Sequence, residues 1–280
     1  MIIWIASYPK SGNTWVRSFL TAYYFCESGI FDINKLNLIE DYPNKQFFKE
    51  KVKQGEIHKH WETSQKDICD QKKVKFLKTH NSLINAFGND FTKPEYSLGV
   101  IYVIRDPRNV ITSVKNHNDL DSYDEALKFM QDENKVLEDY PHLKNYAKTN
   151  IVNSWRINYR SWLSNKSFRR VTIRYEDMVK NPAQTFEKLV VFVNTLMRFD
   201  NKIDQKKLNN AIDTTNFKSL QNIENAGKFG ENVYSLKDNR KIKFFYQGPE
   251  NDWKKNLDEN MIKKMNEYYQ NDLKFFQYEN

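Results

Sequence analysis

The sequence predicts a three-layer α/β fold whose central sheet is mostly parallel. Short apolar runs suited to buried strands alternate along the chain with stretches in which apolar residues recur at helical spacing. The run at residues 98–104 is almost continuously apolar, which is typical of a strand buried on both faces of a parallel sheet. Neither an internal repeat nor a Gly/Ser-rich linker divides the 280 residues, so we expect one domain over residues 1–280.

The first expected strand, residues 2–6, runs into a tight loop at residues 7–15 with the sequence SYPKSGNTW. From Trp15 onward apolar residues recur at helical spacing, and Gly29 is the expected stop of this helix. A strand, loop and helix in this order point backbone N–H groups and the positive end of a helix dipole at one spot, which suits a phosphate. The loop is P-loop-like in layout but lacks the GxxxxGK[ST] pattern, so we expect an anion site rather than an ordinary ATP site.

The remaining elements follow in chain order. Residues 37–73 are polar and aromatic with weak periodicity, so we expect irregular helices or a mobile cover over a site. The later expected strands are residues 74–79, 98–104 and 171–174. Asp106 and Pro107 are suited to the N-cap and first position of a helix, and Pro182 predicts the start of another.

Polar residues that can carry chemistry lie where the expected strands end, which is where such sheets bind ligands. Lys78 and His80 project to the same side of an extended segment, as a charge stabiliser and a general base would. Arg105 ends the third strand, and Ser113 lies about two helical turns beyond the cap, so the two predict a phosphate clamp. Taken singly, each segment also fits a structural role.

Charge and cysteine content exclude several classes of protein. The net charge of +8 comes from lysines spread along the chain without an Arg-rich block, so we expect solvated lysine faces and no nucleic-acid partner. Cys26 and Cys69 have neither metal-ligand spacing nor a disulfide framework, and no carboxylate cluster predicts a metal site. The sequence has no signal peptide and no membrane-length apolar run, so we expect a soluble, cytoplasmic protein.

Together these segments resemble the sulfotransferase family. The opening loop is similar to that family's 5′-phosphosulfate-binding loop, YPKSG[TN]TW, and Arg105 to Ser113 is similar to its 3′-phosphate motif. Further segments that resemble family motifs are KTH at 78–80, YEDM at 175–178, TNF at 215–217, and Gly248 followed by DWK at 252–254. The matches occur in family order from residue 2 to about residue 256, so they cover nearly the whole chain.

The resemblance implies transfer of a sulfuryl group from 3′-phosphoadenosine 5′-phosphosulfate (PAPS) to an acceptor hydroxyl or amine. It implies His80 as the general base, with Lys10 and Lys78 stabilising charge during in-line transfer. Besides Lys10, the residues implied to bind PAPS are Ser11, Gly12, Asn13, Thr14, Trp15, Arg105, Ser113, Tyr175, Thr215, Phe217, Gln247 and Gly248. Sulfuryl transfer, like phosphoryl transfer, spreads negative charge over oxygens, so positioned cations and N–H donors suit it without a metal.

Two departures from the family pattern stand near the carboxyl terminus. Residues 246–248 are Tyr-Gln-Gly where cytosolic members carry Arg-Lys-Gly, a further contact to the 3′-phosphate. Gln247 or the basic run at residues 237–243 are the candidate replacements, although a solvated lysine-rich loop also explains that run. Residues 254–259 do not match the family's KxxxTVxxxE dimer motif, so the resemblance implies no particular oligomeric state.

Other conspicuous residues are expected to be structural. Trp155 and Trp162 are expected in the core, and Glu176 is expected to cap the turn that follows it. His58 and His60 lie in the expected cover and are predicted to be surface histidines rather than acceptor contacts.

Two other functions stay open beside sulfuryl transfer: a P-loop-like kinase that depends on ATP and Mg²⁺, and a nucleotide-binding module without turnover. The acceptor also stays open, between a glycan and a small phenol or alcohol metabolite. Acceptor choice in such folds lies in variable loops, here expected at residues 30–73, 84–97, 116–150 and 222–245.

Overall fold

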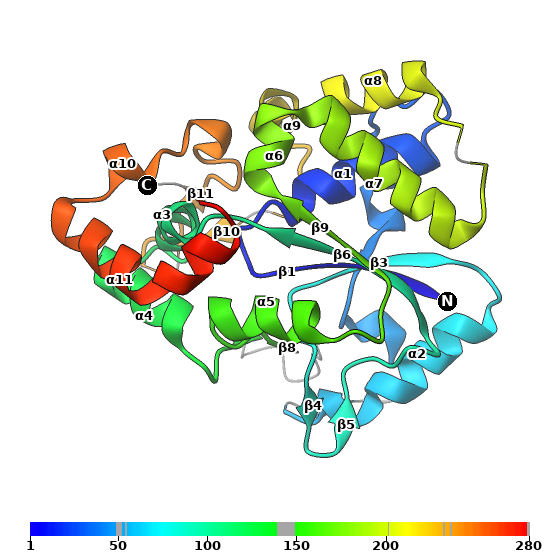
Figure 1. Ribbon diagram of the computed structural model, residues 1–280, viewed down its shortest axis with the longest axis horizontal. Coiled ribbons are helices and arrows are strands. Elements are labelled where there is room, and N and C mark those ends of the chain that lie inside the picture. Colours follow the sequence, from blue (N-terminus) through cyan, green and yellow to red (C-terminus); the bar gives the residue numbers. More distant parts are fainter. Residues whose placement is uncertain are drawn as a thin grey trace.

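The computed structural model describes residues 1–48, 52–53, 55–138, 149–200, 202–231, 233–235 and 237–278. In this part of the chain the central sheet has five strands, ordered β2-β3-β1-β6-β9 and all parallel (Figure 1). The strands are β1 (Ile2–Ser7), β2 (Glu40–Asp41), β3 (Lys75–Thr79), β6 (Ser97–Ile104) and β9 (Arg170–Arg174). The predicted α/β fold with a parallel sheet is confirmed.

Helices cover both faces of the sheet because successive side chains of β1 point to opposite sides. Ile3 and Ile5 are buried in a core formed with the helices of one face, whereas Trp4 and Ala6 belong to the core of the other. The first face carries α1 (Asn13–Phe25), α7 (Pro182–Met197), α8 (Gln205–Thr215) and α9 (Phe217–Asn225). The second carries α2 (Trp61–Asp70), α3 (Pro107–His117), α4 (Tyr123–Gln131), α5 (Trp155–Ser164) and α11 (Glu259–Phe275). In Figure 1 the first group of helices lies above the strands, whereas α2 and α5 lie below them and α3, α4 and α11 lie at the left.

The helix starts follow their local signals. Pro107 begins α3, and Asp106 caps it by accepting a hydrogen bond of 2.9 Å from the backbone N–H of Arg108. Pro182 begins α7, as predicted. The predicted end of α1 at Gly29 is wrong, because the chain turns extended at Cys26 and the helix ends at Phe25.

Residues 37–73 contain irregular helices, one of the two alternatives expected, and also a strand of the central sheet. Within this range β2 extends the edge of the sheet beside β3, and α2 packs into the core. Trp61 and Tyr42 are fully buried, and the Tyr42 hydroxyl lies 2.7 Å from Ser64 Oγ. The periodicity is weak because the range is broken into short 3₁₀ segments, namely η1 (Ile33–Leu38), η2 (Lys45–Phe47) and η3 (Ile57–His60).

Smaller elements complete the described chain. Three antiparallel pairs are β4 (Asn85–Ala86) with β5 (Asn89–Asp90), β7 (Val136–Glu138) with β8 (Thr149–Ile151), and β10 (Val233–Tyr234) with β11 (Lys241–Ile242). The short helices are α6 (Tyr175–Lys180), α10 (Trp253–Asn256) and the 3₁₀ turn η4 (Gly248–Glu250). Part of the predicted variable loop at 116–150, residues 139–148, lies outside the described residues.

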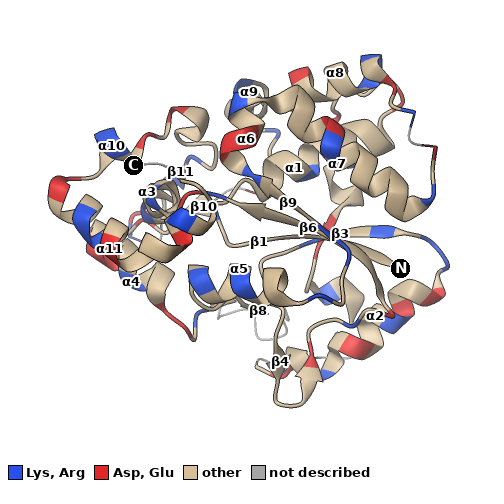
Figure 2. Ribbon diagram, in the orientation of Figure 1, with Lys and Arg blue, Asp and Glu red and all other residues tan. Residues whose placement is uncertain are grey.

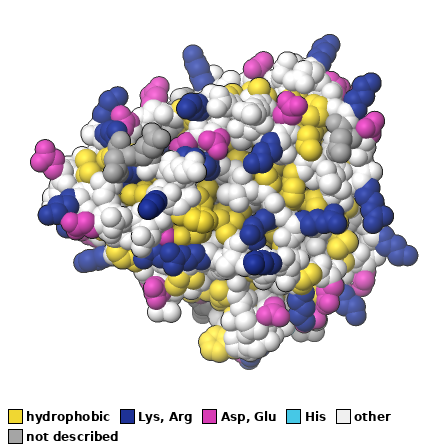
Figure 3. Space-filling view, in the orientation of Figure 1, with side chains coloured by type: hydrophobic (Ala, Val, Ile, Leu, Met, Phe, Trp, Pro, Cys, Tyr) yellow, Lys and Arg dark blue, Asp and Glu magenta, His cyan; other side chains and the backbone are white. Residues whose placement is uncertain are grey.

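Tryptophans lie in the core, and most charged side chains lie at the surface. Trp155 and Trp162 are buried, as predicted. Lys and Arg are scattered over helices and loops of all layers (Figure 2), and on the face in Figure 3 they surround separate apolar patches. None of the helices in the described ranges is long and apolar enough to cross a membrane.

Candidate active site

The predicted site segments meet at one edge of the sheet. β1 ends at Ser7, β3 at Thr79 and β6 at Ile104, and β1 lies between the other two. The chain leaves β1 for β3 on one side and continues to β6 on the other, so the loop after β1 lies where the strand order divides. Parallel α/β sheets bind ligands at such a point.

The loop after β1 presents an open helix N-terminus. Gly12, directly before α1, has φ of 100°, and a Cβ there would lie 2.6 Å from Cδ2 of Tyr175. No side chain caps α1, in contrast to α3 with its Asp106 cap. The first N–H groups of α1 and the positive end of its dipole are therefore available to an anion.

Side chains of the loop divide into those that hold the loop and those that face a ligand. Asn13 Nδ2 donates to the Ile5 carbonyl at 2.9 Å and to Ser7 Oγ at 3.1 Å, so it ties the loop to the end of β1. Ser11 is buried, and its hydroxyl has no hydrogen-bond partner in the described part of the chain. Asn13 is thus left to meet a ligand chiefly through its backbone N–H.

Buried donors without partners support an anionic ligand. Ser11 Oγ and Arg105 Nε are buried and make no hydrogen bond with any residue that the structure describes. Such groups are uncommon in folded proteins, because an unsatisfied buried donor costs about 1–3 kcal/mol. Phosphate and sulfate oxygens supply the acceptors that these donors lack, so the residues present fit a nucleotide phosphosulfate.

Arg105 joins four of the predicted segments. Its Nη1 lies 3.4 Å from the Lys10 carbonyl and 3.4 Å from Ser113 Oγ, and its Nη2 donates to the Gly248 carbonyl at 3.1 Å. The guanidinium carbon stands 4.0 Å from the centre of the Tyr175 ring. A stacked and hydrogen-bonded guanidinium keeps its planar fork in a fixed direction, which suits a phosphate clamp.

Lys10 lies between α3 and the loop at 243–247. Its Nζ is 3.2 Å from Nδ1 of His117 and 4.1 Å from the centre of the Phe244 ring. The pKa of Lys10 is lowered to about 7, chiefly by burial; Glu231 opposes this shift, and Arg105 and Lys78 add to it. Sequence reasoning missed both His117 and Phe244. His117 could have been predicted as a site residue, because it lies four residues after Ser113 and therefore on the same face of the helix.

His80 has one nitrogen engaged by the end of β1. Its Nδ1 lies 2.9 Å from the Ser7 carbonyl, which can only accept, so Nδ1 carries the proton in this contact. The lone pair is then on Nε2, the nitrogen that would accept a proton. Asn158, fully buried, donates to the His80 carbonyl at 3.0 Å and fixes this backbone.

Lys78 has a carboxylate partner. Its Nζ lies 3.2 Å from Oδ2 of Asp41, and the register of β2 and β3 places these two residues side by side. Sequence reasoning missed Asp41, because a two-residue edge strand carries no periodic signal.

A second carboxylate comes from the segment after α9. Glu231 Oε1 accepts a hydrogen bond of 2.5 Å from Nη1 of Arg17, a buried residue of α1. Burial opposes the ionisation of Glu231, but Arg17 and then Lys78 outweigh it, and its pKa is lowered. Sequence reasoning missed this pair as well.

Two of the residues implied to bind PAPS, Trp15 and Thr215, are buried in the structure. The Trp15 ring packs between Tyr175 and Phe186, with ring centres 5.7 and 5.8 Å away, and is 8% exposed. Thr215 is fully buried, and its hydroxyl donates to the Ala211 carbonyl at 2.6 Å. These contacts leave Trp15 and Thr215 more in the core than at a binding surface.

At residues 246–248, where the sequence departs from the family pattern, and at the candidate replacement, residues 237–243, side chains make local contacts with other parts of the protein. Gln247 exchanges two hydrogen bonds with the Asn256 amide, at 3.2 and 3.1 Å. Gly248 has φ of 54°, and the Phe217 ring lies where its Cβ would be. In the basic run, Lys237 pairs with Asp121 at 2.5 Å and Arg240 pairs with Asp119.

Two structural predictions need correction. Glu176 does not cap the turn that follows it, because its Oε1 accepts a hydrogen bond of 2.9 Å from the backbone N–H of Asp106. This contact joins α6 to the start of α3, and burial raises the pKa of Glu176. His58 is buried rather than on the surface, because its ring packs 5.2 Å from that of Phe87.

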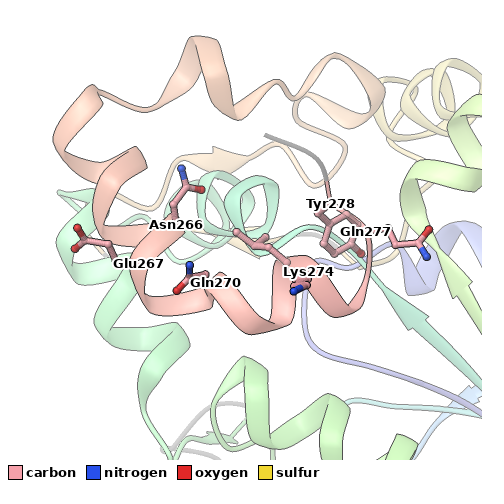
Figure 4. A pocket seen from close by; sticks show the side chains of 7 residues that line it. Asn266, Glu267, Gln270, Lys274, Gln277 and Tyr278 are labelled. Atoms are coloured by element: carbon pink, nitrogen blue, oxygen red, sulfur yellow. The ribbon is translucent and has the colours of Figure 1, made fainter.

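A groove on α11 lies apart from this site. It is lined by Asn266, Glu267, Gln270, Leu273, Lys274, Gln277 and Tyr278 (Figure 4). None of these is a predicted site residue. Among the residues that the structure describes, no three His, Cys, Asp or Glu side chains are grouped so that they could hold a metal ion.

Comparisons with known proteins agree with the sequence motifs. A family model described as "Sulfotransferase domain" matches residues 2–277. Sulfotransferase 1A1 of Canis lupus familiaris is 25% identical over 258 residues, which are 89% of this chain and 76% of the relative. Sulfotransferase 1E1 of Homo sapiens is 25% identical over 286 residues, covering 96% of this chain and 83% of the relative.

Solved structures show the same fold. Retinol dehydratase in complex with androsterone and the inactive cofactor PAP has a TM-score of 0.60 at 17% identity, over 98% of this chain and 80% of that one. Mouse sulfotransferase SULT7A1 complexed with PAP has a TM-score of 0.56 at 15% identity, over 97% and 84% of the two chains.

Proposed function

This chain belongs to the sulfotransferase domain family, and we propose that it transfers a sulfuryl group from PAPS to an acceptor hydroxyl or amine. The observation that carries this proposal is the convergence of three segments on one buried guanidinium and one uncapped helix. Arg105 contacts the Lys10 carbonyl, Ser113 and Tyr175, while the N-terminus of α1 stands open beside them. A ligand with phosphate at both ends of a nucleoside matches two separate anion sites.

The proposed reaction uses residues from both sides of β1. The acceptor oxygen or nitrogen attacks sulfur, the sulfur–oxygen bond to the 5′-phosphate breaks, and the products are the sulfated acceptor and PAP. His80 takes the acceptor proton at Nε2, since Nδ1 is held by the Ser7 carbonyl. Lys10, Lys78 and the first N–H groups of α1 stabilise the charge that develops on the transferring group and the leaving oxygen.

Different residues would contact the two ends of PAPS. Arg105 and Ser113 would hold the 3′-phosphate, supported by Tyr175 beneath the guanidinium. Ser11 and the backbone of Gly12 to Thr14 would hold the phosphosulfate. Because Gln247 is bound to Asn256, we propose that Arg105 and Ser113 supply the main 3′-phosphate contact.

The test combines binding with turnover. Calorimetry with PAP should show tight binding, and labelled PAPS should transfer its sulfate to a member of an acceptor panel of glycans, phenols and alcohols. The variant His80→Ala should lose about 10²–10⁴-fold in kcat, the usual contribution of a general base, while it still binds PAP. The matched control is Lys263→Ala, at a lysine whose side chain is 75% exposed on α11.

Each other outcome has a definite meaning. Unchanged turnover in His80→Ala would remove its role as the base. PAP binding without transfer to any acceptor would favour a binding module. Dependence of activity on ATP and Mg²⁺ would favour a kinase and contradict the proposal.

A further inference from the structure

The ammonium of Lys10 is held by a residue that no sequence motif assigns. Its Nζ lies 3.2 Å from His117 Nδ1, and the same nitrogen stands over the Phe244 ring at 4.1 Å. The His117 and Phe244 rings themselves meet edge to face, with centres 5.9 Å apart. Lys10, His117 and Phe244 therefore form one packed contact among the loop after β1, the end of α3 and the segment before η4.

His117 contacts Lys10 as a neutral acceptor. Burial lowers the pKa of His117 to about 2, and Lys10, His80 and Lys78 all act in the same direction. The ring is thus uncharged at neutral pH. Because an ammonium only donates, Nδ1 supplies the lone pair and the ring proton is on Nε2.

One face of α3 contacts two of the cations of the site, Arg105 and Lys10. Ser113 and His117 are four residues apart in α3, so their side chains are neighbours on the same helix face. Ser113 contacts Arg105, and His117 contacts Lys10. A single rigid helix thereby sets the distance between the 3′-phosphate clamp and the lysine at the transfer end.

We propose that His117 is a positioning residue, whose Nδ1 holds the Lys10 ammonium beside the reaction centre until the anionic oxygens of the donor take its place. The proposal rests on the proposed function for the identity of the donor. The contact between Lys10 and His117 does not depend on the identity of the donor. A neutral acceptor suits this role, because it orients the ammonium but competes weakly with a phosphosulfate oxygen.

The contact between Lys10 and His117 should affect how the affinity for PAP changes with pH. Glu231 and Glu224 face Lys10 with negative charge and raise its pKa, Arg105 and Lys78 lower it, and burial brings it to about 7. His117 favours the charged form of Lys10 by accepting its hydrogen bond. Since a bound phosphate needs the charged form, affinity for PAP should fall as pH rises above neutrality. Without the His117 acceptor, the affinity for PAP should begin to fall at a lower pH.

The experiment compares two replacements of His117. His117→Phe keeps a ring but removes the acceptor, whereas His117→Asn keeps an acceptor oxygen near the position of Nδ1. We expect His117→Phe to lower PAP affinity and kcat about tenfold near neutral pH, because Lys10 is then less often charged and is no longer oriented before the donor binds, with an unchanged KM for the acceptor. His117→Asn should restore most of both, and thermal unfolding identifies variants that fail to fold.

A direct measurement separates this proposal from the proposed function. NMR titration of lysine side chains labelled at Cε, with Lys10 assigned by Lys10→Met, reports the pKa of Lys10 in the ligand-free protein. A lower Lys10 pKa in His117→Phe but not in His117→Asn supports the positioning role, even if PAPS is not the donor. Equal Lys10 pKa values in wild type and His117→Phe would overturn it, even if sulfuryl transfer is confirmed.

Discussion

Two lysines stand at the same edge of the sheet, each 3.2 Å from its partner, and the partners differ in charge. Lys78 on β3 is paired with the carboxylate of Asp41 on β2. Lys10 in the loop after β1 meets the neutral ring of His117, and burial lowers its pKa to about 7. The ion pair ties Lys78 to the sheet, whereas the neutral contact leaves Lys10 ready to transfer to an incoming anion. The charged partner therefore holds Lys78 in place, whereas the neutral partner lets Lys10 move to the donor.

The largest expected effect is the difference in kcat/KM between a variant that lacks Lys10 and one that lacks Lys78. Lys10→Met should lower kcat/KM by about 10²–10³, the usual cost of removing a group that stabilises transition-state charge. Lys78→Met should cost about tenfold less, because Asp41 already balances part of its charge. Initial rates with labelled PAPS measure both, with Lys263→Met as the surface control. Equal losses of kcat/KM in the two variants would contradict the proposed difference between Lys10 and Lys78.

Removing the carboxylate beside Lys78 should affect stability more than binding. Asp41→Asn leaves a buried ammonium without its ion pair, so we expect the free energy of unfolding to fall by about 1–3 kcal/mol. Urea denaturation measures this loss. The matched control is Asp124→Asn, which breaks an exposed pair with Lys264 and should cost less than about 1 kcal/mol. If the two variants lose equal stability, the Lys78–Asp41 pair does not act as a structural tie.

The smallest effect is expected at Glu231, the acid that Lys10 and Lys78 share. Its negative charge faces both lysines and Arg17 at the site where an anion would bind. Glu231→Gln should therefore tighten PAP binding about fivefold, or about 1 kcal/mol, as removal of a like charge at moderate distance predicts. Calorimetry at low and high salt measures it, and the gain should shrink with salt. Weaker binding would indicate instead that the pair with Arg17 shapes the site.

Much of the framework could be predicted because its signals are local. The strands at 98–104 and 171–174 showed in apolar runs, and Asp106 with Pro107 marked the start of α3. The loop after β1 was recognisable because a strand, a glycine turn and a helix follow one another without interruption. The edge strand β2 was missed, because a two-residue strand leaves no periodic pattern, whereas the irregular helices expected within residues 37–73 are present as η2, η3 and α2.

By itself the sequence determined the family, and it predicted which polar residues follow the strands and which cations belong to the proposed site. Each of these depends on residues within one short segment. Only the tertiary structure decided the partners of those cations: His117 lies 107 residues from Lys10, Asp41 lies 37 from Lys78, and Glu231 lies 214 from Arg17. Contacts over such separations depend on how whole layers pack. Packing also places Trp15 and Thr215 in the core, because burial depends on every neighbour in space and only some of them are neighbours in sequence.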